Sequence, residues 1–153
     1  MKKLFGFIFI LVLAELSAAP TTYRDSTGKI TATATRNGSI TTYRDATGKI
    51  IGISVQSGTR IIYRSATGEI TRSAEKNGSH TTYLDRHGIV SGTATELNDQ
   101  ITYRDRTGQI TGTAAVNKNN GAVYRDASGK ITGSVTDSLD DAVTRDGFLH
   151  LGK

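Results

Sequence analysis

Residues 21–31 read TTYRDSTGKIT, and variants of this word return along most of the chain at a nearly fixed spacing. The tyrosines that mark the copies are separated by 20 residues four times and then by 21. The later copies are TTYRDATGKII (41–51), IIYRSATGEIT (61–71), TTYLDRHGIVS (81–91), ITYRDRTGQIT (101–111) and AVYRDASGKIT (122–132). A broken seventh copy, AVTRDGF (142–148), has Thr144 in place of the tyrosine. This regularity predicts tandem copies of one structural unit.

Each copy contains two turn signals separated by strand-forming residues. The first is Asp-x-x-Gly, as in residues 25–28, which we expect to form a four-residue loop. The second is a dipeptide such as Asn37-Gly38, which favours a two-residue type I′ turn. The residues between the turns are rich in Thr, Ile, Tyr and Val and alternate in character, which is typical of strands. The copies therefore predict tandem β-hairpins.

The expected turns define which side chains share a face. A four-residue loop places Arg24 opposite Lys29 and Tyr23 opposite Ile30, so that Tyr, Ile and the small residues form the buried face. On this register the repeat core consists of Tyr23, Tyr43, Tyr63, Tyr83, Tyr103 and Tyr124. Further along the same face lie mostly Gly, Ala and Ser, with Arg72 as an unexplained exception. Small residues let backbones approach closely, so we expect the hairpins to converge at their Asn-Gly ends and to splay at their Asp-x-x-Gly ends.

The resulting fold class is all-β: six tandem antiparallel β-hairpins plus a half repeat, in a curled meander, a flower-like ring or a closed barrel-like array. Residues 142–145 could pair with the first strand of the first unit and close a ring. The alternative is an open stack capped by Phe148, Leu149 and Leu151, because repeat arrays need protected ends.

The first residues have the features of a signal peptide. Lys2 and Lys3 precede an apolar run from Leu4 to Leu13, and small residues precede an expected cleavage after Ala18. The run is short for a membrane span, so we expect no transmembrane segment after cleavage and a secreted or periplasmic bacterial protein. Removing residues 1–18 lowers the formal charge from +5 to +4.

Residues 19–153 then form a single β-repeat domain. Its repeats lie near 21–40, 41–60, 61–80, 81–100, 101–121 and 122–141, with a capping half repeat at 142–153. Cysteine is absent, which excludes disulfides and thiolate metal sites.

The word Tyr-x-Asp-x-x-Gly-x-Ile-Thr at this period resembles the YD repeats of Rhs-type proteins, and also small bacterial β-flower-like repeat proteins. The resemblance covers nearly all of the chain after the leader. In large YD-repeat proteins it implies a β-shell that encloses a toxin. Six units are too few for such a shell, and the arginine between tyrosine and aspartate departs from the simple Tyr-Asp form.

The chain offers no arrangement typical of catalysis, a cofactor or a metal. His80, His87 and His150 lie in different units without metal-ligand spacing, and no Gly-x-Ser-x-Gly motif is present. The carboxylates that recur in the turns are explained by capping of the turn backbone. Whether Asp137, Asp140 and Asp141 bind calcium is left open, since calcium needs six to eight well-placed oxygens. We therefore expect a protein that is not an enzyme and has no catalytic, cofactor-binding or metal residues.

One charged position recurs in the repeat and is a candidate anion-binding site. It is occupied by Arg24, Arg44, Arg64, Arg104, Arg125 and Arg145. A ring of guanidinium groups could bind an anionic polysaccharide or a lipid head group. The alternative is a structural role, in which each Arg pairs with the Asp of its own turn or blocks edge pairing. Nucleic acid is not an expected partner, because stacking on single strands needs exposed rings and these tyrosines belong to the buried face.

These observations predict a non-enzymatic exported β-repeat protein with a structural or adhesive role at the cell envelope, through binding or self-association. The alternative is a soluble binding module for an anionic glycan or lipid head group that uses the repeated Arg positions.

Overall fold

The computed structural model describes residues 20–118 and 121–136, and every regular element in them is a β-strand. The strands are β1 (Thr21–Asp25), β2 (Ile30–Asn37), β3 (Ile40–Asp45), β4 (Ile50–Ser57), β5 (Arg60–Ser65), β6 (Ile70–Asn77), β7 (His80–Asp85), β8 (Val90–Leu97), β9 (Gln100–Asp105), β10 (Ile110–Val116), β11 (Ala122–Asp126) and β12 (Ile131–Thr136). Consecutive strands pair in an antiparallel manner, so each repeat is one hairpin. The expected all-β array of hairpins is confirmed, and the described residues include no helix long and apolar enough to cross a bilayer.

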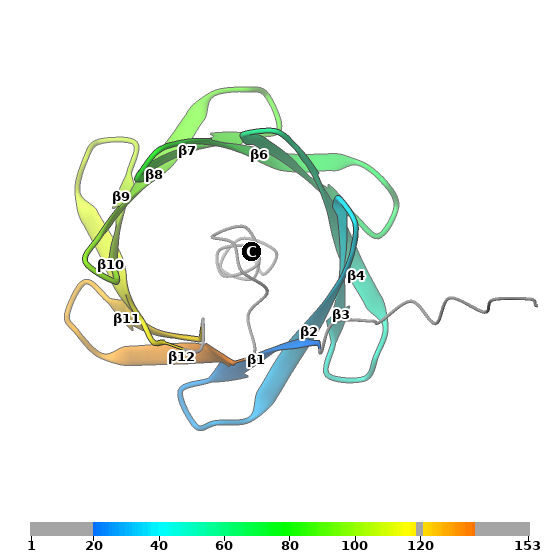
Figure 1. Cartoon of the computed structure of the whole chain (residues 1–153), viewed down its shortest axis with the longest axis horizontal. Helices are drawn as coiled ribbons and strands as arrows, with labels where there is room; N and C mark the ends of the chain where they lie inside the picture. Colours follow the sequence, from blue (N-terminus) through cyan, green and yellow to red (C-terminus); the bar gives the residue numbers. More distant parts are fainter. Residues whose placement is uncertain (1–19, 119–120, 137–153) are drawn as a thin grey trace, which may run out of the picture.

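The hairpins close into a barrel (Figure 1). The closing ladder joins β1 to β12, with Thr22 opposite Thr136 and Tyr23 opposite Val135. Our prediction that residues 142–145 pair with the first strand is wrong, because β2 and β12 already occupy both edges of β1. The sixth complete unit therefore closes the ring. The predicted leader at 1–18 and the predicted half repeat at 142–153 lie outside the described residues.

The Asp-x-x-Gly turn has a three-residue loop, not the four-residue loop we expected. The Asp25 N–H donates to the Lys29 carbonyl at 3.0 Å, and the Gly28 N–H donates to the Asp25 carbonyl at 3.0 Å. Gly28 has φ of +86°, a conformation that glycine adopts without steric cost. Type I turns of this kind, followed by a left-handed residue, are common in three-residue hairpin loops.

A β-bulge compensates for the odd loop length. Arg24 is opposite Ile30 and Tyr23 is opposite Ala32, so Thr31 is an extra residue in the ladder. The Thr31 hydroxyl donates to the Tyr23 carbonyl at 3.3 Å across this bulge. The same register shift occurs in all six hairpins. The bulge returns the tyrosines and the small residues to one face, which a three-residue loop alone would not do.

The second turn also differs from the expected geometry. Asn37 pairs with Ile40, so Gly38 and Ser39 are the central residues of the turn. Gly38 has a positive φ of 57° and Ser39 does not, which is the pattern of a type II′ turn. In unit four, Leu97 pairs with Gln100, and Asn98 and Asp99 have φ of 48° and 62°. Of these two turns, only the one in unit four has the positive φ values of the type I′ turn that we predicted.

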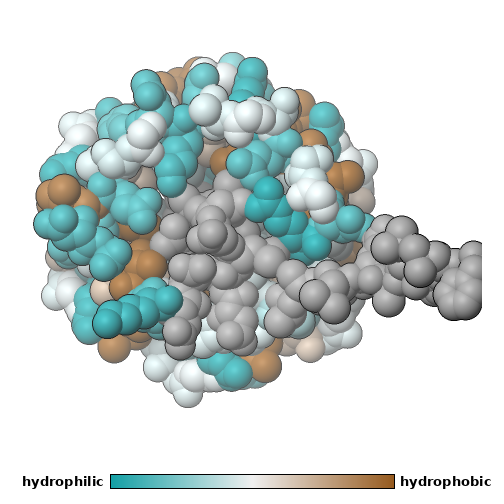
Figure 2. Space-filling model, viewed as in Figure 1, coloured by the Kyte–Doolittle hydropathy of each residue, from teal (hydrophilic) through white to brown (hydrophobic). Residues whose placement is uncertain are grey.

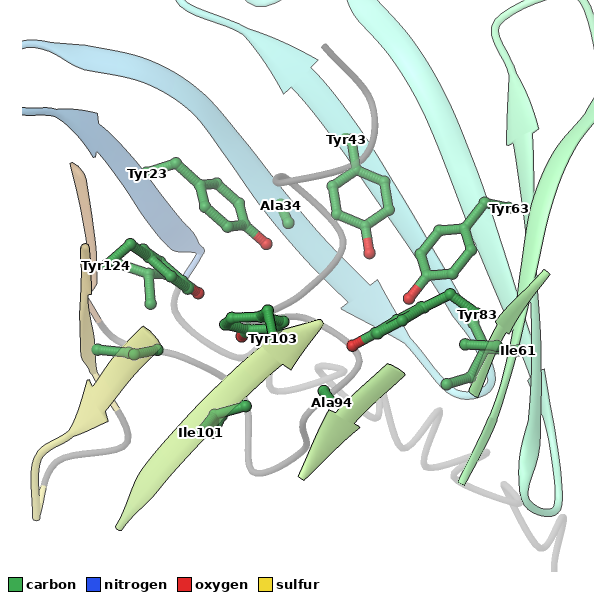
Figure 3. Close-up of a cluster of buried hydrophobic side chains, with 14 of the residues drawn as sticks. Tyr23, Ala34, Tyr43, Ile61, Tyr63, Tyr83, Ala94, Ile101, Tyr103 and Tyr124 are labelled. Atoms are coloured by element: carbon green, nitrogen blue, oxygen red, sulfur yellow. The ribbon is translucent and has the colours of Figure 1, made fainter. Parts of the chain in front are cut away.

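The tyrosines point into the barrel and form its core (Figure 3). Tyr43 has no exposed surface and lies between Ala34 of the preceding hairpin and Gly52 of its own. The exposed fractions of all six tyrosines lie between 0% and 8%. The small residues predicted on this face therefore have a clear purpose, because they leave space beside each ring. The repeat core predicted from sequence is correct for its tyrosines.

The isoleucines predicted on the buried face lie on the outside instead. Ile30 is 39% exposed because the bulge places it opposite Arg24, on the outer face. The equivalent residues are exposed to a similar extent: Ile50 (40%), Ile70 (45%), Val90 (42%), Ile110 (43%) and Ile131 (42%).

The hairpins splay at one end, as expected. Figure 1 shows the Asp-x-x-Gly loops projecting outward beyond the ring of strands (Figure 1). At the inner face the backbones approach closely: a Cβ built on Gly112 would lie 2.5 Å from the Arg125 carbonyl oxygen, and one on Gly92 equally close to that of Arg104. We refer to residues 24–30, 44–50, 64–70, 84–90, 104–110 and 125–131 as the flared tips.

Candidate functional site

The recurring arginine, present in five of the six flared tips, binds the turn that it precedes. In every case Nη1 donates to the carbonyl oxygen of the turn glycine at 2.9 Å. The pairs are Arg24 with Gly28, Arg44 with Gly48, Arg64 with Gly68, Arg104 with Gly108, and Arg125 with Gly129. The structural alternative of an Arg–Asp pair is therefore replaced by a bond to the backbone. Arg145 lies outside the described residues.

This bond leaves most of each guanidinium available to a ligand. A guanidinium carries five N–H donors, and the bond to the glycine carbonyl uses one of them. The side chains of Arg44, Arg104 and Arg125 are exposed, and those of Arg24 and Arg64 are half-buried. Among the described residues, none of these five forms an ion pair with a carboxylate. The turn thus holds each arginine in place on the outer face while its charge remains uncompensated by a contact.

Five of the six tips have an aspartate that binds the turn backbone, and Ser65 takes this place in unit three. Asp25 Oδ1 accepts bonds from the Thr27 N–H at 2.8 Å, the Thr27 hydroxyl at 2.6 Å and the Lys29 N–H at 3.1 Å. The pKa of Asp25 is lowered, chiefly because the Thr27 hydroxyl donates to the carboxylate. The pKa values of four equivalent residues are lowered as well: Asp45, Asp85, Asp105 and Asp126. Each of these carboxylates is therefore bonded within its own turn, whereas the guanidinium group of the recurring arginine is on the outer face.

These lowered pKa values predict acid sensitivity. A carboxylate whose pKa is depressed on folding stabilises the protein above its ordinary pKa of 3.8, and this contribution is lost as the pH falls through the depressed value. We expect the melting temperature to fall as the pH drops below the ordinary carboxyl pKa of 3.8. Replacing Asp45 and Asp105 with Asn removes two titrating groups, so the variant should show a shallower decline. An equally steep decline in that variant would mean that the turn carboxylates do not control acid unfolding.

Charge is concentrated at the splayed end of the barrel. The flared tips contain ten Lys or Arg against six Asp or Glu, a net charge of +4. The described residues around the opposite turns contain four Lys or Arg against three Asp or Glu, a net charge of +1. At that opposite end Lys76 Nζ also lies 3.5 Å from Glu96 Oε2. The positive charge of the described residues is therefore greatest at the flared tips.

Arg72, which the sequence left unexplained on the buried face, lies in the interior of the barrel. Arg72 lies opposite Tyr63 in the ladder and is half-buried, and burial lowers its pKa while Tyr63 and Tyr83 act in the opposite direction. It lines a cavity of about 550 Å³ together with Tyr83, Tyr103 and Tyr124. The only sequence signal for this site is the charge at a position where other units have Gly or Ala.

No cluster of three or more His, Cys, Asp or Glu side chains in the described residues could hold a metal ion. His80 Nδ1 lies 3.3 Å from the Thr95 hydroxyl, and His87 Nε2 accepts a bond from Arg86 Nε at 2.9 Å. His150 falls outside the described part of the chain, as do Asp137, Asp140 and Asp141, for which calcium binding was left open. On the face drawn in Figure 2, hydrophobic residues form separate patches between hydrophilic ones (Figure 2).

Comparison with known proteins supports the fold alone. No family model matches the chain, and no curated protein matches it. The X-ray structure of a protein from Arabidopsis thaliana is similar, with a TM-score of 0.57 over 88% of this chain and 90% of that chain. The two sequences are 9% identical, so this similarity shows the fold alone. The resemblance to YD repeats stays a prediction.

Proposed function

We propose that this chain is a non-enzymatic exported binding module of the cell envelope that binds an anionic glycan or lipid head group through its flared tips. The observation that carries the proposal is the repeated arginine, fixed at 2.9 Å from its turn glycine in five units. Phosphate, sulfate and carboxylate groups are the partners that a fixed guanidinium suits best. The leader predicted from sequence at residues 1–18 supports export.

Repetition around a ring adds avidity. Single arginine contacts at a hydrated surface are weak, but tethered sites raise one another's effective concentration on a polymer or membrane. The net charge of +4 at the flared tips favours approach from that end.

Closure of the barrel favours a binding role over polymerisation. A fibre built by strand addition needs an unpaired edge, and both edges of β1 are occupied by β2 and β12. A structural or adhesive role at the envelope is therefore proposed through binding of an anionic surface, and not through edge-to-edge self-association.

Replacing Arg44 and Arg104 with Gln tests this role. Wild-type protein should bind phosphatidylglycerol-containing vesicles or dextran sulfate, and binding should weaken as salt is added. The double variant should bind about tenfold or more weakly at low salt, since each basic residue near an anionic surface contributes about 1 kcal/mol. Cosedimentation and a retention assay on immobilised dextran sulfate measure the two arms.

The matched control removes two exposed cations from the opposite end, by Arg60→Gln and Lys118→Gln. Unit four carries Leu84 at the arginine position and still forms its hairpin, so loss of the arginine is compatible with folding. Equal weakening in the two double variants would point to net charge alone and would overturn a specific role of the flared tips. Failure of wild-type protein to bind either probe would overturn the proposed function.

A further inference from the structure

The flared tip of unit four is apolar where the other tips are polar. Leu84 replaces the recurring arginine, and Ile89 occupies the position that carries Lys, Glu or Gln in the other five units. Leu84 lies opposite Val90 in the ladder, so their side chains share the outer face. Ile89 is 60% exposed and Val90 is 42% exposed. The three residues, which we call the apolar tip, flank one turn: Leu84 and Val90 are opposite each other in the ladder, and Ile89 is paired with Asp85 at the next position.

The turn holds the apolar tip rigidly. The Asp85 N–H donates to the Ile89 carbonyl at 2.8 Å, and the Ile89 N–H donates to Asp85 Oδ1 at 3.0 Å. The His87 N–H donates to the same carboxylate oxygen at 2.8 Å. Ile89 is therefore presented to solvent by an ordered turn. A scattered exposed aliphatic residue needs no explanation, whereas two apolar replacements at otherwise polar positions of the same tip make that tip a candidate contact surface.

The same tip and the two neighbouring tips carry cations. Arg86 lies in the same turn, Arg64 lies on the neighbouring tip of unit three, and Arg104 and Arg106 lie on the neighbouring tip of unit five. Apolar side chains flanked by basic residues are the combination with which peripheral proteins bind the interface of an anionic bilayer. A hydrated glycan offers charge but little apolar surface, so the apolar tip favours lipid as the partner.

We propose that the apolar tip of unit four inserts into the interfacial region of an anionic lipid bilayer while the flanking arginines bind the head groups. The inference rests on the proposed function and narrows its ligand from anionic groups in general to a membrane surface. Insertion buries the exposed parts of Ile89 and Val90, and the arginines supply the electrostatic attraction that a short apolar tip alone lacks.

A variant that gives unit four the residues of the other units separates insertion from simple attraction. Leu84→Arg with Ile89→Lys matches the first two units, so its hairpin should fold, and it adds two positive charges. Electrostatic attraction alone predicts tighter binding to phosphatidylglycerol-containing vesicles. Insertion predicts binding about tenfold weaker at moderate salt, because the buried aliphatic surface is lost. On dextran sulfate the variant should bind as tightly as wild type or more tightly.

Leu97 provides the matched control, because it is 70% exposed and lies at the opposite end of β8. Leu97→Lys should leave vesicle binding unchanged. The chain has no tryptophan, so Ile89→Trp adds a single fluorescent reporter whose emission should shift to the blue on vesicles, whereas Leu97→Trp should not shift.

Each outcome decides between the two proposals. Tighter or unchanged vesicle binding by the Leu84→Arg, Ile89→Lys variant, or equal shifts from the two tryptophans, overturns insertion and leaves binding through the flared tips intact. Binding of wild-type protein to dextran sulfate but not to vesicles has the same consequence. Binding to neither probe overturns both.

Discussion

A cysteine pair at Thr22 and Thr136 should form a disulfide that joins the first strand to the last and stabilises the barrel strongly. The two residues are Cα partners in the closing ladder, on strands that are adjacent only because the ring is closed. The bond would close a loop of more than 100 residues, for which loss of unfolded-state entropy predicts up to about 4 kcal/mol of stabilisation. Urea unfolding with and without reductant measures the effect, and the absence of native cysteine keeps the measurement clean.

The control places the second cysteine at Thr93, which lies in β8 and does not neighbour β1 in the sheet. Thr22→Cys with Thr93→Cys should stay reduced in the monomer under the same oxidising conditions. If the Thr22–Thr136 pair instead cross-linked only between molecules, the ring would be open and the assignment of β12 as the partner of β1 would be wrong.

Truncation of a core tyrosine should be the most destabilising single change among the repeats. Tyr43 is fully buried, and its hydroxyl lies 3.2 Å from the Ser54 hydroxyl. Its cross-strand neighbours are Ala34 and Gly52, which are too small to fill the space that Tyr43→Ala would leave. We expect a loss of about 3–5 kcal/mol in the free energy of unfolding, measured by urea denaturation.

Two comparisons isolate the cause. Tyr43→Phe removes only the hydroxyl and should cost about 1 kcal/mol. Ile30→Ala truncates a side chain on the outer face, where 39% of it is exposed, and should cost much less than Tyr43→Ala. If Ile30→Ala proved as costly as Tyr43→Ala, the bulged register would be wrong and the isoleucines would belong to the core.

The repeat itself predicted most of the architecture. The spacing of the tyrosines, the two turn signals and the alternating strands led to hairpins with Tyr and small residues on one face, and the structure confirms this. The exact register was out of reach, because loop length and bulge compensate for one another. A three-residue loop with a bulge at Thr31 and a four-residue loop without one put Tyr23 on the same face. They differ at Ile30, which only the structure places outside.

The closure of the barrel and the contacts of the candidate site could not be predicted from the sequence pattern of a single repeat. The broken seventh copy and the sixth copy both resemble strands, and the choice of partner for β1 depends on ring geometry that no single repeat contains. The recurring arginines stood out as candidates, but their bond to the turn glycine follows from the three-residue loop. Unit four drew notice only for its missing charge. Ile89 was missed, although the expected four-residue loop would have placed it opposite Leu84.

Because the ring is closed, the number of repeats also sets the diameter of the barrel. In an open array, gaining or losing a 20-residue copy lengthens or shortens a rod without disturbing its interior. Here one additional hairpin would enlarge the circumference, because barrel diameter grows with strand number. The tyrosines would then lie further apart, and the cavity in the barrel interior would widen. Duplication of a repeat is therefore constrained by the geometry of the closed ring. Sequence divergence at a single tip, such as that of unit four, does not change the barrel diameter.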